Sequence, residues 1–227
     1  MKSVLSIDFT NKNSLIRAGE LLKKSDLGIE VSRIMPSEYS KIKKEFGTDH
    51  KEVSLISIDT FISTTNFVEE NHYLKQFGVA LDIGSQLKCE NFLCELDLIA
   101  VNGEVPKLSS RVHENEIIKN SLELLSNIKR VSEIRKKKFF IFPLSILSSK
   151  TLFERVSELS EILDFIQARQ IKIALEIKID DLAEVEKILV TFSNKIGYIR
   201  IVEAKSIIES TFLSDYLSSI DFLSIKL

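Results

Sequence analysis

Residues 138–178, KFFIFPLSILSSKTLFERVSELSEILDFIQARQIKIALEIK, predict a strand, a Ser-rich loop, an amphipathic helix and a second strand. Residues 139–142 and 172–177 are short apolar runs of the kind that form buried strands. Between them, apolar residues recur every three or four positions, along one face of a helix: Leu152, Val156, Leu159, Leu163 and Ile166. Ser148 and Ser149 are the expected N-cap residues. The segment is a βαβ unit, whose crossover lets its two strands run parallel.

The rest of the chain repeats this unit. We expect strands at 3–9, 27–34, 53–58, 77–83, 96–101, 139–142, 172–177 and 196–201. We expect helices near 13–22, 36–46, 69–75, 87–94, 114–135, 152–166, 182–192 and 207–217, and a short apolar end at 222–227. Eight strands with helical segments between most neighbours predict an α/β fold, a compact (β/α)8 TIM-like barrel, as a single domain over residues 1–227. An open doubly wound sheet is the alternative, but no Gly-rich phosphate loop follows the first strand.

Composition narrows the class of protein. The chain has 227 residues, of which 44% are hydrophobic and 28% charged, as in ordinary globular proteins. Its apolar runs are too short to span a bilayer, and no signal peptide is visible. Cys89 and Cys94 are five residues apart, expected on a helix as core residues, which is no zinc pattern; we expect a reduced, cytoplasmic location. The net charge of −2 means that any binding to nucleic acid needs a local basic patch.

Polar residues at the carboxyl ends of barrel strands are the candidates for catalysis, because active sites of this fold lie there. They are Asp8, Arg33, Asp59, Asp82, Asn102, Ser145, Glu176, Lys178, Arg200 and Glu203. The three aspartates fit a magnesium cluster, but caps of the following helices or turns are the simpler interpretation.

Other catalytic patterns are weak. His50, His72 and His113 stand apart from one another, which disfavours a metal site. Glu176 and Lys178, with Asp97, match the residue types of restriction-like nucleases, but about eighty residues separate them, which favours chance. No G-x-S-x-G motif supports a serine hydrolase.

One basic cluster is present, at Lys129-Arg130 and Arg135-Lys136-Lys137-Lys138. It fits a solvated helix end stabilised by the helix dipole and, about equally, a patch that contacts phosphates. Lys41, Lys43 and Lys44 support such a patch more weakly.

Across nearly its whole length the chain resembles archaeal ribonuclease P protein component 3, a small TIM-barrel subunit related to the polymerase-and-histidinol-phosphatase barrels. The likeness lies in MKSVLSIDF (1–9), LGIEVSRI (27–34), EVSLISID (52–59), FGVALDIGSQLKCENFLCELDLIAV (77–101), IGYIRIVEAKSIIES (196–210) and DFLSIKL (221–227). It also lies in Phe142, Pro143, Leu144, Ser149, Glu154 and Arg155. Ile7-Asp8-Phe9 stands where the related phosphoesterases have His-x-His, which fits a barrel without metal chemistry of its own.

The resemblance implies a noncatalytic protein subunit of the endonuclease ribonuclease P, which assists the RNA-catalysed removal of the 5′ leader from precursor tRNA. The implied partners are ribonuclease P RNA, precursor tRNA indirectly, and a second protein subunit (component 2). No catalytic residue, metal or cofactor is expected in the chain itself. The implied RNA-binding residues are Lys129, Arg130, Arg135, Lys136, Lys137, Lys138, Lys150 and Arg155.

The sequence leaves two other functions open. One is a stand-alone, metal-dependent TIM-barrel enzyme of the xylose-isomerase-like or sugar-phosphate class. It would use Glu176 and neighbouring strand-end acids around a divalent metal. The other is a degenerate barrel that serves only as a scaffold.

Overall fold

The structure, a computed structural model, describes residues 2–8, 28–32, 53–63, 67–99, 111–143, 151–178, 182–202 and 220–226. Eight parallel strands in these ranges close into a barrel in the order β1 to β8. They are β1 Lys2–Asp8, β2 Gly28–Ser32, β3 Val53–Ser63, β4 Asn91–Ile99, β5 Lys138–Ile141, β6 Ile171–Ile177, β7 Ile196–Ile201 and β8 Phe222–Lys226. The (β/α)8 fold class is therefore confirmed, while the single-domain boundary at 1–227 stays a prediction.

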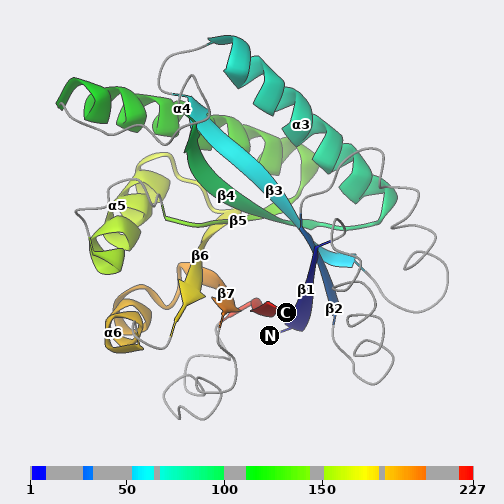
Figure 1. Ribbon diagram of the computed structural model, residues 1–227, viewed down its shortest axis with the longest axis vertical. Helices are drawn as coiled ribbons and strands as arrows, with labels where there is room; N and C mark the ends of the chain where they lie inside the picture. The colour runs from blue at the N-terminus through cyan, green and yellow to red at the C-terminus, as the bar shows by residue number, and fades with distance from the viewer. Residues whose placement is uncertain are drawn as a thin grey trace.

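Closure joins the two ends of the sequence. β1 pairs with β8 in parallel, with Lys2 opposite Phe222 and Ser6 opposite Lys226. Figure 1 shows both chain termini beside these strands. A closed barrel has no unpaired sheet edge, so every strand is hydrogen-bonded on both sides.

Four helices are described, and they lie outside the barrel (Figure 1): α3 Phe67–Gln86, α4 Arg111–Arg135, α5 Leu152–Phe165 and α6 Leu182–Phe192. No helix in the described ranges is long and apolar enough to cross a membrane. Helix α5 begins at an N-cap of Thr151, whose side chain accepts from the N–H of Glu154 while the Glu154 carboxylate accepts from the N–H of Thr151. This reciprocal capping box corrects the expected caps Ser148 and Ser149, which lie outside the described residues.

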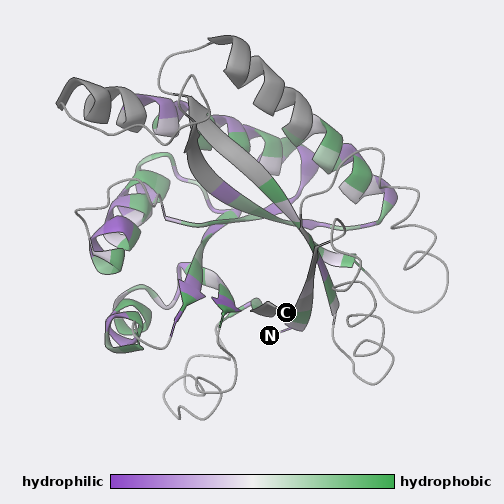
Figure 2. Cartoon of the chain, in the orientation of Figure 1, coloured by the Kyte–Doolittle hydropathy of each residue, from purple (hydrophilic) through white to green (hydrophobic). Residues whose placement is uncertain are grey.

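The strands carry two separate cores on their two faces. The outward face packs against the helices and includes Ile29, Val31, Ile56, Ile58, Phe92, Cys94, Phe139, Ile141, Ile173, Leu175, Ile199 and Ile201. The alternate, inward positions form a second cluster: Val4, Leu55, Leu93, Phe140, Ala174, Tyr198 and Phe222. Figure 2 shows that α5 and α6 each carry both hydrophobic and hydrophilic residues, and their buried hydrophobic residues belong to the outer core. Strand alternation thus fixes which residues can reach the barrel interior.

The segment 77–94 differs from the prediction. Residues 77–83, expected as a strand, belong to helix α3, and residues 91–94, expected in a helix, belong to β4. A short apolar run does not by itself separate a strand from a buried helix. Here Phe77, Ala80, Leu81 and Gly84 recur at helical spacing, and the buried ones face the barrel. Cys89 therefore lies just before β4, and Cys94 lies within it, so neither is on the expected helix.

The eighth strand is also not the predicted one. Residues 196–201 form β7, and the apolar end of the chain at 222–226 supplies β8. The predicted number of strands was correct only because the false strand at 77–83 compensated for the missed strand at 222–226. The helices expected at 13–22, 36–46 and 207–217 lie outside the described residues.

Two glycines of α3 allow a matched test of this packing. A Cβ on Gly84 would lie 2.5 Å from Cζ of the buried Phe92 ring, whereas a Cβ on Gly78 meets nothing within 4 Å. Gly78→Ala should raise the free energy of unfolding by about 1 kcal/mol, because alanine favours the helix. Gly84→Ala should lower it by about 1–3 kcal/mol, because the ring is overpacked. Urea unfolding of both variants checks the opposite signs; a Gly84→Ala protein as stable as Gly78→Ala would contradict the placement of α3 on β4.

Candidate functional site

Glu30 of β2 is the centre of a polar network inside the barrel. Its side chain is 0% exposed, and four donors reach its carboxylate. Ser6 Oγ and Arg200 Nη2 donate to Oε1, each at 3.1 Å. Tyr198 OH and Ser224 Oγ donate to Oε2 at 2.7 and 2.5 Å. A carboxylate has about four lone-pair sites, so this buried charge is fully hydrogen-bonded.

Arg200 of β7 is the single cation that the described part of this network contains. Its side chain is 6% exposed, and its Nη1 donates to Glu95 Oε1 at 2.7 Å. Glu176 Oε2 lies 3.6 Å from the same nitrogen. Nε donates to Tyr198 OH at 3.2 Å, and the guanidinium stands 5.0 Å from the ring centroid of Phe142. One planar group therefore binds three carboxylates from β2, β4 and β6.

Strand register explains why these residues meet. Ser6 is opposite Glu30, Glu176 is opposite Arg200, and Arg200 is opposite Ser224. All of them occupy inward positions, on the carboxyl-terminal side of the inner apolar cluster. The barrel interior is consequently apolar toward the amino ends of the strands and polar toward the carboxyl ends, where active sites of this fold lie.

Three carboxylates and one guanidinium leave the network with a net charge of −2, from Glu30, Glu95, Glu176 and Arg200. Burial lowers the pKa of Arg200, but Tyr198, Glu30 and Glu95 raise it by more, so the net shift is upward and the guanidinium stays charged. Burial first, and then the charge of Glu30, raises the pKa of Tyr198 well above its usual value of 10. The phenol therefore keeps its proton and acts as a donor to Glu30.

Glu95 and Glu176 differ from Glu30 in their access to solvent. Their side chains are 34% and 35% exposed, and they flank Arg200 at the polar end of the barrel. Glu30 is thus the buried support, while these two carboxylates are the groups that can reach a ligand. Chemically, the arrangement offers two acid–base groups and one fixed cation within reach of a small molecule.

The structure brings together two of the residues predicted from strand ends, Glu176 and Arg200. Asp82 instead lies on the outer surface of α3 and pairs with Arg135 at 3.3 Å, and Lys178 is exposed after β6. Asp8, Asp59 and Asp97 lie on β1, β3 and β4, but their side chains are not among those described. Arg33, Asn102, Ser145 and Glu203 lie outside the described residues.

Sequence reasoning missed Glu30, Glu95 and Tyr198. A signal was present, since Glu30 interrupts the apolar strand GIEVS and Glu95 interrupts NFLCELDLI. An ionisable residue inside a buried strand needs a partner, because an unpaired buried charge is costly. Searching for the matching cation would have pointed to Arg200 in IGYIRI.

Most of the predicted basic residues lie at the end of α4 and in the turn to β5. Lys129 pairs with Glu133 at 3.8 Å, and Lys137 donates to the carbonyl of Cys89 at 3.0 Å. Arg130, Lys136 and Lys138 are exposed. Arg155 is half-buried on α5, and its Nε has no hydrogen-bond partner among the described residues. Lys150 lies outside them. The positions fit a capped, solvated helix end, and contact with a phosphate stays a prediction.

The cysteines and histidines give no reactive centre in the described part of the chain. Cys89 and Cys94 are both free and buried. Burial first, and then the charge of Glu95, raises the pKa of the Cys94 thiol far above its usual range, so it is not a nucleophile at neutral pH. His50 lies outside the described residues, and the side chains of His72 and His113 are not described.

Solved structures give the comparison that the sequence does not. No protein-family model and no curated protein matches the chain. The 3-keto-D-glucoside 4-epimerase YcjR of E. coli matches with a TM-score of 0.71 and 12% identity, over 100% of this chain and 91% of the epimerase. D-psicose 3-epimerase with D-fructose gives 0.66 and 13%, over 100% and 84%. The IolI protein, solved with a zinc atom, gives 0.62 and 16%, over 100% and 89%. At such identities the likeness establishes the fold.

The resemblance to ribonuclease P component 3 is wrong. The structures that match along the whole chain include a sugar epimerase, a putative sugar phosphate isomerase/epimerase and a xylose isomerase domain protein. The predictions that rested on this resemblance are wrong as well. They are the subunit role, the RNA and component 2 partners, and the tRNA-processing, RNA-binding and endonuclease functions. The physical reason is visible in residues 77–101: the likeness assumed strand, helix and strand there, but the chain forms the end of α3 and then β4.

The described residues do not fit a zinc site of the kind that the IolI structure implies. No group of three or more His, Cys, Asp or Glu side chains among them could hold a metal ion. Glu30, Glu95 and Glu176 converge, but Arg200 lies between them and takes up their charge. A divalent cation at the same place would meet a guanidinium, and the two cations repel.

The raised pKa of Tyr198 gives a pH test of the network. The folded protein holds a proton that the unfolded chain releases near pH 10, so this contribution is complete below pH 10 and is lost as the pH rises further. Tyr198→Phe should be less stable than wild type at pH 8 by about 1–3 kcal/mol, because Glu30 loses a donor. Between pH 10 and 11 the gap should narrow by up to about 1.4 kcal/mol per unit.

Urea unfolding at a series of pH values measures both proteins. Because all other titrating groups are shared, the difference between them isolates Tyr198. A gap that stays constant from pH 8 to 11 would contradict the buried Tyr198–Glu30 contact.

Proposed function

We propose that the chain is a barrel enzyme that moves a proton next to the carbonyl of a small polyhydroxylated molecule, as a sugar epimerase or isomerase does. The observation that carries the proposal is the pair of partly exposed carboxylates, Glu95 and Glu176, on either side of Arg200 at the carboxyl-terminal end of the barrel. The matching structures, which include 3-keto-D-glucoside 4-epimerase and D-psicose 3-epimerase, support the substrate class.

Glu176 is the proposed general base. Its Oε2 lies 3.6 Å from Arg200 Nη1, beyond hydrogen-bond distance, so this oxygen is not committed to a hydrogen bond with Arg200. The carboxylate takes the proton from a carbon beside the substrate carbonyl, and the electron pair of that C–H bond forms an enolate. A proton from water to the opposite face gives the epimer, and Glu176 then releases its own proton to solvent. Return of the Glu176 proton to the neighbouring carbon, with a proton moving between the two oxygens of the enediolate, gives the isomer.

Arg200 is proposed to stabilise the enolate oxygen with its fixed positive charge, since it is held in place before the substrate binds. Glu95, at 2.7 Å from Nη1, orients the guanidinium and offers a second carboxylate to the substrate hydroxyls. Phe142 stacks over the guanidinium and limits the water around it.

A second candidate is a noncatalytic barrel. Arg200 already donates to Glu30, Glu95 and Tyr198, and such saturation favours a structural plug over a group that a substrate must recruit. Both candidates keep the network intact, and they differ in whether Glu176 meets a ligand. A cytoplasmic location stays a prediction that the free thiols of Cys89 and Cys94 support.

Proton exchange distinguishes the candidates. The protein is incubated with D-fructose, D-psicose and D-tagatose in D2O, and proton NMR follows deuterium entering the carbons next to the carbonyl. Wild type should catalyse exchange with at least one ketose. Glu176→Gln should slow it about 10²–10⁴-fold, because glutamine cannot accept the proton. The exposed Glu186 of α6 provides the control, and Glu186→Gln should exchange at the wild-type rate.

Two outcomes go against the proposal. Exchange that persists in Glu176→Gln would remove Glu176 as the base. Folded wild-type protein that exchanges none of the three ketoses would favour the noncatalytic barrel.

A further inference from the structure

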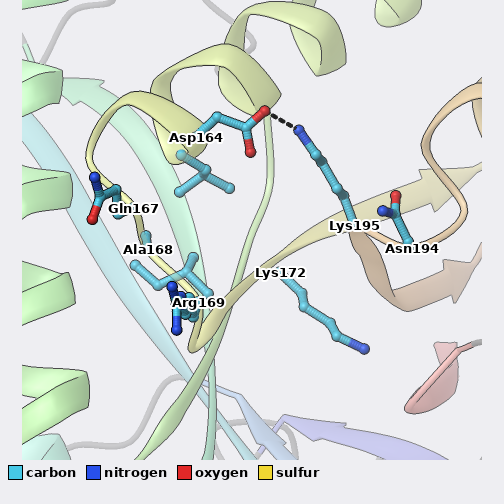
Figure 3. A pocket seen from close by; sticks show the side chains of 9 residues that line it. Asp164, Gln167, Ala168, Arg169, Lys172, Asn194 and Lys195 are labelled. Carbon is cyan, nitrogen blue, oxygen red and sulfur yellow. Dashed lines mark hydrogen bonds and ion pairs between the residues drawn. The ribbon is translucent and has the colours of Figure 1, made fainter.

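A second site lies at the opposite, amino-terminal end of the barrel. A cavity of about 330 Å³ opens between the turn from α5 to β6 and the turn from α6 to β7. Figure 3 shows its polar lining residues: Asp164, Gln167, Arg169, Lys172, Asn194 and Lys195. Lys172 is the second residue of β6, whereas Glu176 is close to its carboxyl end, so the cavity is separate from the Arg200 network.

The cavity gathers positive charge. Arg169, Lys172 and Lys195 contribute three cations to the lining, and Asp164 is the one acid in it. Lys195 is partly neutralised, because its Nζ donates to Asp164 Oδ2 and, at 2.6 Å, to Ser160 Oγ. Figure 3 shows the contact between Lys195 and Asp164 across one side of the cavity.

The other two cations, Lys172 and Arg169, make no ion pair with an acid of the cavity lining among the described residues. Lys172 Nζ lies 3.0 Å from Asp221 Oδ2, near enough for an ion pair, but that oxygen receives no aligned hydrogen bond from the described residues. Arg169 is exposed in the turn and makes no ion pair within the described ranges. Its planar fork of donors is thus available at the cavity rim, and this geometry matches a phosphate group.

The surrounding surface has the same sign. Lys2, Lys137 and Lys138 open or precede β1 and β5 at this end of the barrel, against Glu90 before β4 and Asp221 before β8. Among the described residues, cations therefore outnumber acids around the cavity, whereas Glu30, Glu95 and Glu176 lie toward the other end of the barrel. Such a surface raises the local concentration of small anions.

We propose that this cavity binds a small phosphate-bearing anion, with Arg169 and Lys172 as its main contacts, Lys195 as a supporting charge and the amides of Gln167 and Asn194 as further donors. Its volume is within the range of small-molecule sites, roughly 300–1,000 Å³. The inference does not depend on the proposed isomerase chemistry, because it uses other residues at the other end of the barrel.

Inorganic phosphate is the probe. Isothermal titration calorimetry of the whole chain, at fixed ionic strength with chloride as the balancing anion, should give a dissociation constant near or below about 1 mM. Arg169→Ala and Lys172→Met should each weaken binding about tenfold, because each removes a charge-assisted contact. Lys178→Met, which removes the exposed lysine just beyond the other end of β6, should bind phosphate as wild type does.

Arg169 is exposed, so its alanine variant should fold, and thermal unfolding with and without phosphate gives a second reading. Phosphate should raise the melting temperature of wild type and Lys178→Met more than that of Arg169→Ala. The proposal would be overturned if wild type and Arg169→Ala bound phosphate with equal affinity. It would also be overturned if wild type did not bind phosphate at about 10 mM, tenfold above the expected dissociation constant.

Discussion

The ion pair between Glu30 and Arg200 crosses the barrel interior from β2 to β7, and the polar end of the barrel is arranged around it. Both side chains are almost fully buried, so neither charge can be left without its partner. Ser6, Tyr198 and Ser224 complete the shell of donors around Glu30. Arg200, fixed in this way, holds Glu95 and Glu176 where solvent can reach them. A change at the buried carboxylate would therefore alter the exposed ones.

Among the described residues, the network at one end of the barrel and the cavity at the other carry opposite net charge. Carboxylates exceed cations in the network at the carboxyl ends of the strands, and lysines and arginines exceed acids around the cavity at the amino ends. The net charge of the whole chain conceals this separation. Parallel strands bring the first residues of every strand to one end of the barrel and the last residues to the other. A few charged residues per βα unit are therefore enough to make one end acidic and the other basic.

The sequence predicted the architecture better than the site. The βαβ unit at 138–178 and the helix 182–192 are confirmed because their apolar residues have a clear period. Residues 77–83 were wrongly predicted as a strand, because a short apolar run does not distinguish a strand from a buried helix. Glu176 and Arg200 were predicted as strand-end candidates, but Glu30 was not, because its partner is 170 residues away in the sequence. Contacts across a closed barrel depend on register and closure, which local patterns do not contain.

A double-mutant cycle tests directly whether Glu30 and Arg200 form the pair that holds this network together. Glu30→Gln and Arg200→Met keep the approximate size of each side chain, and urea unfolding gives the stability of wild type, both single variants and the double variant. Each single variant should lose about 3–5 kcal/mol, because it removes one side of a buried ion pair. The double variant should lose less than the sum of the two by about 2 kcal/mol or more. Additive losses would contradict the account, because they would mean that the two charges do not depend on each other.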